Sequence, residues 1–252
     1  MPPSGPGTAP SSGRFTAMRV IAWILAISGV AFGLFTIAFG IVGPDQEIHA
    51  VHNAVVASLL IVLTAPPMIA VARDPERPGR PLVILAALAV AGLGAMGLAL
   101  TPDPFILPVL ILIGVLWWLA PTREGAWPPG RLSIAMVVLV VAAAVLLVPY
   151  ALENAALQRT DHTSDHAAFF HWVETSFYAF GIVVVGLVGA LRPAAFRMAT
   201  PSAGLALVIL GAASVLFAQH ASAIGPPWSW LAVLGGVVFV ASGELEGRRV
   251  TS

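Results

Sequence analysis

The stretch that decides the fold is residues 161–191, which read DHTSDHAAFFHWVETSFYAFGIVVVGLVGAL. Its first fourteen residues carry three histidines and three acids, and its last part, 177–191, is almost entirely apolar. An apolar run that directly continues a polar cluster is typical of a membrane helix with ionisable groups inside its first turns. The stretch therefore predicts both a membrane-spanning helix and a site within it.

The composition of the whole chain supports this prediction. Hydrophobic residues make up 58% of the 252 residues and charged residues 10%, with a mean hydropathy of +0.93. These values are typical of a polytopic membrane protein and exclude a soluble enzyme. The formal net charge is zero, which predicts no nucleic-acid partner. The lack of cysteine excludes disulfides and thiolate metal ligands, and the lack of lysine excludes Schiff-base chemistry.

Eight apolar segments predict an all-α, polytopic integral membrane protein with about eight transmembrane helices. Residues 1–16 are rich in Pro, Gly and Ser, and they are predicted to form a disordered cytoplasmic tail. Residues 17–243 form the predicted transmembrane domain, and residues 244–252 a second cytoplasmic tail. The predicted spans are 17–42, 48–71, 81–100, 105–120, 132–152, 167–191, 203–219 and 228–243.

The arginines orient these helices. All but Arg159 fall in alternate loops or at the two chain ends. Because short loops rich in arginine stay in the cytoplasm, we expect a multi-pass protein of the cell membrane with both termini cytoplasmic. The same orientation places all six histidines at or near the extracytoplasmic ends of helices.

A weak internal repeat is compatible with this layout. A shift of 119 residues places His52 on His171 and Arg73 on Arg192. The spans would then form two four-helix repeats related by an axis along the membrane normal, with His52 and His171 facing each other. Sequence identity under this shift is poor, so the sequence leaves open whether the two repeats exist.

The polar residues of 161–174 predict a site if one helix begins near Ser164 or Asp165 and continues to residue 191. In such a helix, His166, His171 and Glu174 share one face. Glu174 would lie within the hydrocarbon, where an unpaired charge costs at least about 3 kcal/mol. We therefore expect Glu174 to be paired, protonated, bound to a ligand or in a wet cavity.

Two other predicted helices bring similar groups to the same level. His49 and His52 are three residues apart at the start of 48–71 and share a helix face, and Glu153 follows the end of 132–152. Histidine with carboxylate and no thiolate suits zinc, copper(II) or iron(II). The predicted metal ligands are His49, His52, His166, His171 and Glu174, and the predicted catalytic residues are Glu174 and Glu153.

Other residues near this cluster have a less specific interpretation. The alternative for Asp161, His162, Asp165 and His49 is that they are solvated loop or interface residues. On this interpretation Asp161→Ala should have little effect. A hydrogen-bonded cluster that only joins helices is the structural alternative for His52, His171 and Glu174.

The pattern favours a membrane metalloprotein, with an enzyme among the options. Such an enzyme would be a metal-dependent oxidoreductase or hydrolase acting on a lipid-like or quinone substrate, because the site lies where hydrocarbon meets water. One alternative is a haem b electron-transfer subunit with His52 and His171 as axial ligands. The other is a subunit that transports protons or metal ions, with Glu174 as a titrating carboxylate. The sequence leaves the metal, the substrate and the oligomeric state open.

Overall fold

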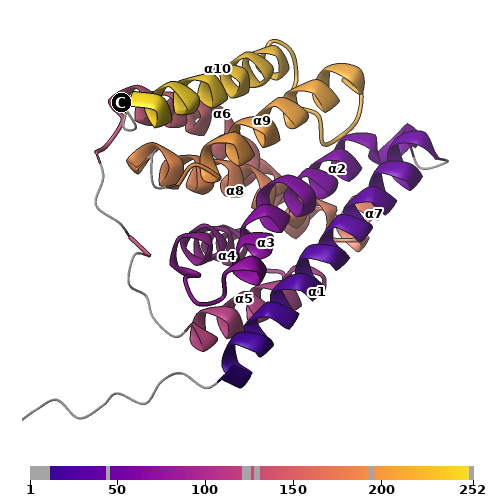
Figure 1. Cartoon of the computed structure of the whole chain (residues 1–252). Helices are drawn as coiled ribbons and strands as arrows, with labels where there is room; N and C mark the ends of the chain where they lie inside the picture. Colours follow the sequence, from indigo (N-terminus) through magenta and orange to yellow (C-terminus); the bar gives the residue numbers. More distant parts are fainter. Residues whose placement is uncertain (1–11, 44–45, 121–125, 128–130, 193–195, 250–252) are drawn as a thin grey trace, which may run out of the picture.

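The computed structural model describes residues 12–43, 46–120, 126–127, 131–192 and 196–249, and its elements in this part of the chain are all helical (Figure 1). Two π-helical segments, η1 and η2, continue α1 and join α2 to α3. The elements are α1 (Ser12–Ile37), η1 (Ala38–Val42), α2 (Gln46–Ser58), η2 (Leu59–Thr64), α3 (Ala65–Arg73), α4 (Gly79–Ala99), α5 (Ile106–Leu119), α6 (Ile134–Thr160), α7 (Asp165–Ala168), α8 (His171–Leu191), α9 (Ala199–Leu216) and α10 (Trp228–Arg249).

Seven helices in the described part of the chain are long and apolar enough to cross a membrane, which confirms a multi-pass membrane protein. They correspond to all of the predicted spans except 105–120. That segment forms α5, a helix of 14 residues. At 1.5 Å per residue α5 is about 21 Å long, shorter than the hydrocarbon core of roughly 30 Å.

The helices extend beyond several predicted boundaries. α1 begins at Ser12, so residues 12–16 of the predicted tail are helical, and α10 continues through 244–249. Residues 1–11 and 250–252 of the two predicted tails lie outside the described residues. α6 begins after Ser133, whose side chain accepts a hydrogen bond from the Met136 amide, and continues through Pro149 to Thr160. The helix therefore includes the segment that carries Glu153.

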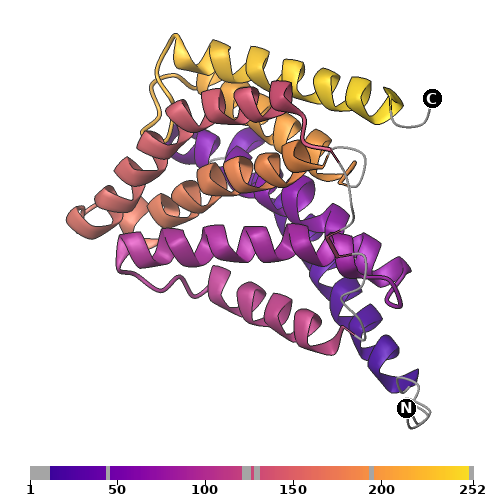
Figure 2. The same ribbon diagram turned by 90° about the vertical axis from the view of Figure 1, so that its left-hand side faces the viewer.

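The bundle is organised around two helices. The spans 48–73 and 171–191 are the most buried. In their apolar stretches 67% and 72% of the residues are buried, against 22% in the first and last spans. α8 packs against α4, α6 and α9, and α2 packs against α1 and α9. The first turn of α1 and the last turn of α10 lie at the same end of the bundle (Figure 2).

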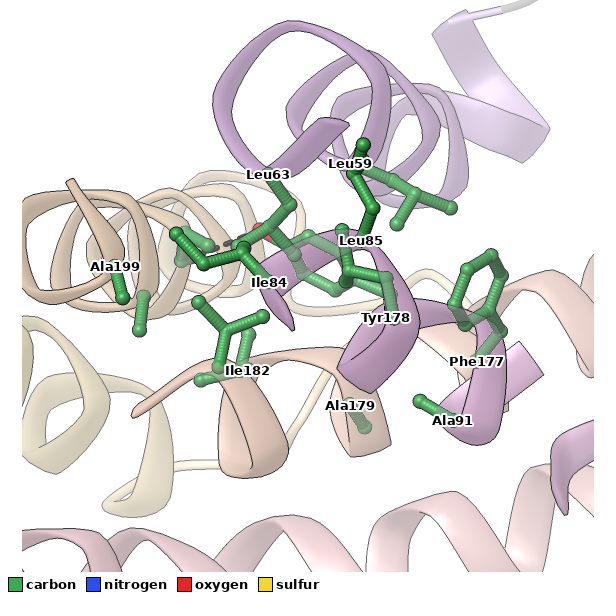
Figure 3. Packing of buried hydrophobic residues seen from close by; sticks show 14 of the residues in the cluster. Leu59, Leu63, Ile84, Leu85, Ala91, Phe177, Tyr178, Ala179, Ile182 and Ala199 are labelled. Atoms are coloured by element: carbon green, nitrogen blue, oxygen red, sulfur yellow. Dashed lines mark hydrogen bonds between the residues drawn. The ribbon is translucent and has the colours of Figure 1, made fainter. Parts of the chain in front are cut away.

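The core lies where α2, η2, α4 and α8 meet. Leu63, Leu85 and Tyr178 are fully buried there (Figure 3). The Tyr178 hydroxyl lies 2.7 Å from both Ser58 Oγ and the Ala206 carbonyl oxygen, so it can accept a hydrogen bond from Ser58 while it donates one to Ala206. This contact joins α8 to α2 and to α9 one level below the predicted site.

The α9–α10 interface generates a packing prediction. A Cβ atom at Gly236 would lie 2.5 Å from the Gly204 carbonyl oxygen and 2.7 Å from Val208 Cγ2. Gly236→Val is therefore expected to separate the two helices and to lower the Tm of the detergent-purified protein by roughly 3–10 °C. Gly94→Val is the matched control, because a Cβ at Gly94 meets nothing within 4 Å. Equal Tm values for the two variants would contradict this packing.

Candidate metal centre

The candidate site begins with a short helix and a sharp turn. Ser164 caps α7, as predicted, by accepting a hydrogen bond from the Ala167 amide at 3.3 Å. The prediction of one helix from here to residue 191 is wrong, because α7 ends at Ala168 and Phe170 adopts a left-handed conformation with φ of 65°. α8 starts at His171. His166 and His171 therefore come from separate helices and not from two turns of one helix.

The two helices and α2 bring four histidines together. The His52 and His171 rings are stacked with centroids 3.7 Å apart, and the His49 ring lies 4.6 Å from His166 and 4.8 Å from His171. His49, His52 and His166 are each at most 6% exposed. His49 is therefore buried in the cluster, and its interpretation as a solvated loop or interface residue is wrong.

Glu174 lies one turn into α8 and pairs with this cluster. Its Oε2 atom is 3.0 Å from His52 Nε2, and its side chain is 12% exposed. This contact confirms that the intramembrane carboxylate has a partner, and the partner comes from α2. The pair fixes the rotation of α2 against α8.

The imidazoles and the carboxylate form two groups that could hold a metal ion. One group is His49, His166 and His171, and the other is His52, His171 and Glu174; within each, one ligand atom per residue lies within 4.8 Å of the others. A tetrahedral zinc site with bonds of about 2.0–2.1 Å separates its ligand nitrogens by roughly 3.3 Å. The side chains would need to move by about 1 Å to close around an ion.

The structure therefore brings together the five residues predicted as metal ligands. It does not bring the other candidates into either group. Glu153 is exposed on α6, and His162 is exposed in the loop before α7. His220 follows α9, with its ring 5.3 Å from that of Phe217. A catalytic role for Glu153 stays a prediction to which these contacts add no support.

Two residues that were not predicted to belong to the site support His166. The Trp172 ring is stacked on the His166 ring, with centroids 4.6 Å apart, and its Nε1 atom donates to Asp161 Oδ2 at 3.2 Å. The Asp161 carboxylate also accepts from the Thr163 and Ser164 amides, each at 3.1 Å, and from Ser164 Oγ. These hydrogen bonds lower the pKa of Asp161, the one from the Ser164 hydroxyl most strongly.

Asp161 is therefore more than a solvated loop residue. It organises the turn that precedes α7 and, through Trp172, the position of His166. The spacing Asp161-x-Thr163-Ser164 is the local signal for such a turn, because an Asp side chain accepts hydrogen bonds from amides two and three residues later. The sequence-based expectation that Asp161→Ala has little effect is accordingly revised.

A second carboxyl group lies close to Glu174. Asp103 is fully buried, and its Oδ1 atom caps α5 by accepting from the Phe105 and Ile106 amides at 2.6 and 3.1 Å. Burial raises the pKa of Asp103 to about 6, with a further contribution from the negative charge of Glu174. α5 thus starts beside the carboxylate end of the cluster.

The role of Asp161 can be tested by amide hydrogen exchange. Asp161→Ala removes the acceptor for two amides and for the Trp172 indole, so exchange over 163–168 should accelerate about tenfold at pH 7. Because the folded-state pKa of Asp161 is lowered, its stabilising effect is present at neutral pH and is lost as the pH falls through that pKa. His162→Ala is the control, and equal exchange in the two variants would contradict this role.

No protein-family model, curated protein or solved structure matches this chain. The function proposed below therefore rests on the geometry of the cluster.

Proposed function

We propose that this chain is a membrane-embedded metalloprotein, and that it is an enzyme acting on a lipid-like or quinone substrate. The observation that carries the proposal is the pair of overlapping His and Glu groups inside the bundle. The His52–Glu174 pair already joins α2 to α8, so helix association alone does not account for the convergence of three further imidazoles. A metal ion gives these residues a common function.

The three-imidazole group suits the ion best. Three histidines leave a fourth position open for water or substrate, as in catalytic zinc sites. Imidazole nitrogen is also a good ligand for copper(II) and iron(II), so the donor set admits all three metals. The proposed ligands are His49, His166 and His171.

The second group supplies a base beside the ion. His171 belongs to both groups, so the His52–Glu174 pair lies next to the proposed ion. Glu174 can accept a proton from a bound water or substrate, and His52 can stabilise the resulting state by hydrogen bonding. A bound ion would supply Lewis-acid or redox chemistry at this position. Alternatively, the second group binds the ion directly through His52 and Glu174.

The surroundings of the cluster favour a substrate that dissolves in the membrane. The five residues lie on helices of the two most buried spans, or on the short α7 beside them.

By the arginine pattern they face the extracytoplasmic side of the cell membrane and both termini are cytoplasmic. The common location of the α1 start and the α10 end supports an even number of crossings, with α5 as the short eighth (Figure 2). A two-repeat arrangement is supported only by the contact between His52 and His171.

The alternatives receive less support. A haem between His52 and His171 would have to separate two rings that stack at 3.7 Å. A proton or metal-ion pathway would have to continue past Tyr178, where residues 179–191 of α8 offer no polar side chain. A metal centre that stays at one end of the bundle requires neither change.

The metal proposal is tested by the histidine shared by both groups. His171→Ala should lower the metal content of the detergent-purified protein at least tenfold, because it removes a ligand from either group. His162→Ala, which changes an exposed histidine nearby, should retain the wild-type content. Metal content is measured by inductively coupled plasma mass spectrometry, with size-exclusion elution as the check on folding. Equal content in both variants, or no metal in wild type, would contradict the proposal.

A further inference from the structure

A cavity of about 260 Å³ lies beside the candidate metal centre, between α1, η2, α5 and α8. Its walls are formed almost entirely by Leu, Ile, Val and Phe side chains. Glu174 is the one ionisable residue among the described residues that line it. Ser28 and Thr64 are the other polar residues of the wall. The cavity therefore combines a largely apolar wall with one ionisable group, and that group is a member of the His/Glu cluster.

The cavity opens on the side of the bundle. Two of its lining residues, Phe32 of α1 and Phe105 at the N-cap of α5, are 48% and 59% exposed. Both belong to or adjoin apolar helices, where the surrounding solvent is lipid. Glu174 also lines the cavity, and it contacts His52 at 3.0 Å. A molecule that enters from the bilayer between α1 and α5 thus reaches the cluster without crossing water.

We propose that this cavity binds a single-chain quinol, with its hydrocarbon tail between α1 and α5 and a hydroxyl of its ring directed at Glu174. The proposal rests on the function proposed above and names the substrate class of that site. Glu174 then has two neighbours, the quinol hydroxyl on the cavity side and His52 on the cluster side.

Charge selects the head group. No Arg or His is among the described lining residues, so a phosphate or fatty-acid carboxylate would face Glu174 without a cation to neutralise it. A neutral hydroxyl that donates a hydrogen bond suits a carboxylate acceptor. This criterion favours a neutral head group over anionic phospholipids and fatty acids.

Size and shape favour a single-chain molecule with a flat ring. A volume of about 260 Å³ is near the lower limit of ligand pockets, which are typically about 300–1,000 Å³, and is too small for two acyl chains. Phe32, Phe105 and Phe177 offer aromatic surfaces along the cavity. Aromatic side chains pack well against a planar ring. A quinol with one alkyl or prenyl tail meets both conditions.

A second cavity shows why volume alone does not identify a site. It measures about 330 Å³, lies between α6, α8, α9 and α10, and has no ionisable residue among its described lining residues. Nothing there orients a polar head. It serves instead as the internal control, because each cavity is lined by a glycine that has room for a side chain. A Cβ at Gly29 would lie 3.9 Å from Leu60, and one at Gly235 would lie 3.8 Å from Leu207.

The experiment compares quinol binding by variants in which a large side chain fills one cavity or the other. The full-length protein in lipid nanodiscs is titrated with a benzoquinol that carries a ten-carbon tail, and binding is followed by native mass spectrometry under reducing conditions. Wild type and Gly235→Phe should bind the quinol equally, and Gly29→Phe at least tenfold more weakly. Metal content, measured on the same samples, should be unchanged in all three proteins, because neither glycine belongs to the cluster. Val109→Trp fills the same cavity from α5 and should reproduce the loss.

Several results would overturn the proposal. One is wild-type quinol affinity in Gly29→Phe or Val109→Trp. Another is wild-type protein that binds decanoic acid or a ten-carbon monoacylglycerol as tightly as the quinol, which would remove the head-group selectivity even if neither variant folds. Quinol binding that depends on Gly29 in a protein that holds no metal would leave the cavity assignment standing and refute the metal centre, so the two proposals fail separately.

Discussion

The structure depends on one constraint, which is that ionisable side chains inside membrane-spanning helices must find partners within the protein. An unpaired charge within the hydrocarbon is costly, and Glu174 has a partner there in His52. The contact joins the two most buried spans, whereas the first and last spans, with 22% of their windows buried, surround them. The polar cluster and the centre of the bundle therefore coincide.

The break between α7 and α8 lets three elements contribute to this cluster. If 165–191 were one helix, His166 and His171 would lie about 7.5 Å apart along its axis. The turn at Phe170 instead folds α7 back, so their ring centroids are 5.4 Å apart and His49 of α2 contacts both. Asp161 and Trp172 hold this turn in place. The geometry of the candidate metal site thus depends on a loop that contributes none of its residues.

Much of the fold could be predicted from hydropathy, because a bilayer requires long apolar helices whatever their contacts. The spacing of His49 and His52 also sufficed to place both on one helix face. The break at Phe170 could not be predicted, because Phe169 and Phe170 carry no glycine or proline signal and a left-handed conformation is rare for a phenylalanine. The cavity between α1 and α5 could not be predicted either, because it arises from the packing of helices that are distant in sequence.

The central claim is that the histidine cluster binds a metal ion through imidazole nitrogen. X-ray absorption at the K edge of the metal that copurifies with the full-length protein tests it most directly. We predict a first shell of nitrogen or oxygen at about 2.0–2.1 Å for zinc, with the multiple-scattering pattern of three imidazole rings. An oxygen-only shell, or a metal that is removed by desalting, would contradict the claim and would leave the cluster as a means of joining α2 to α8.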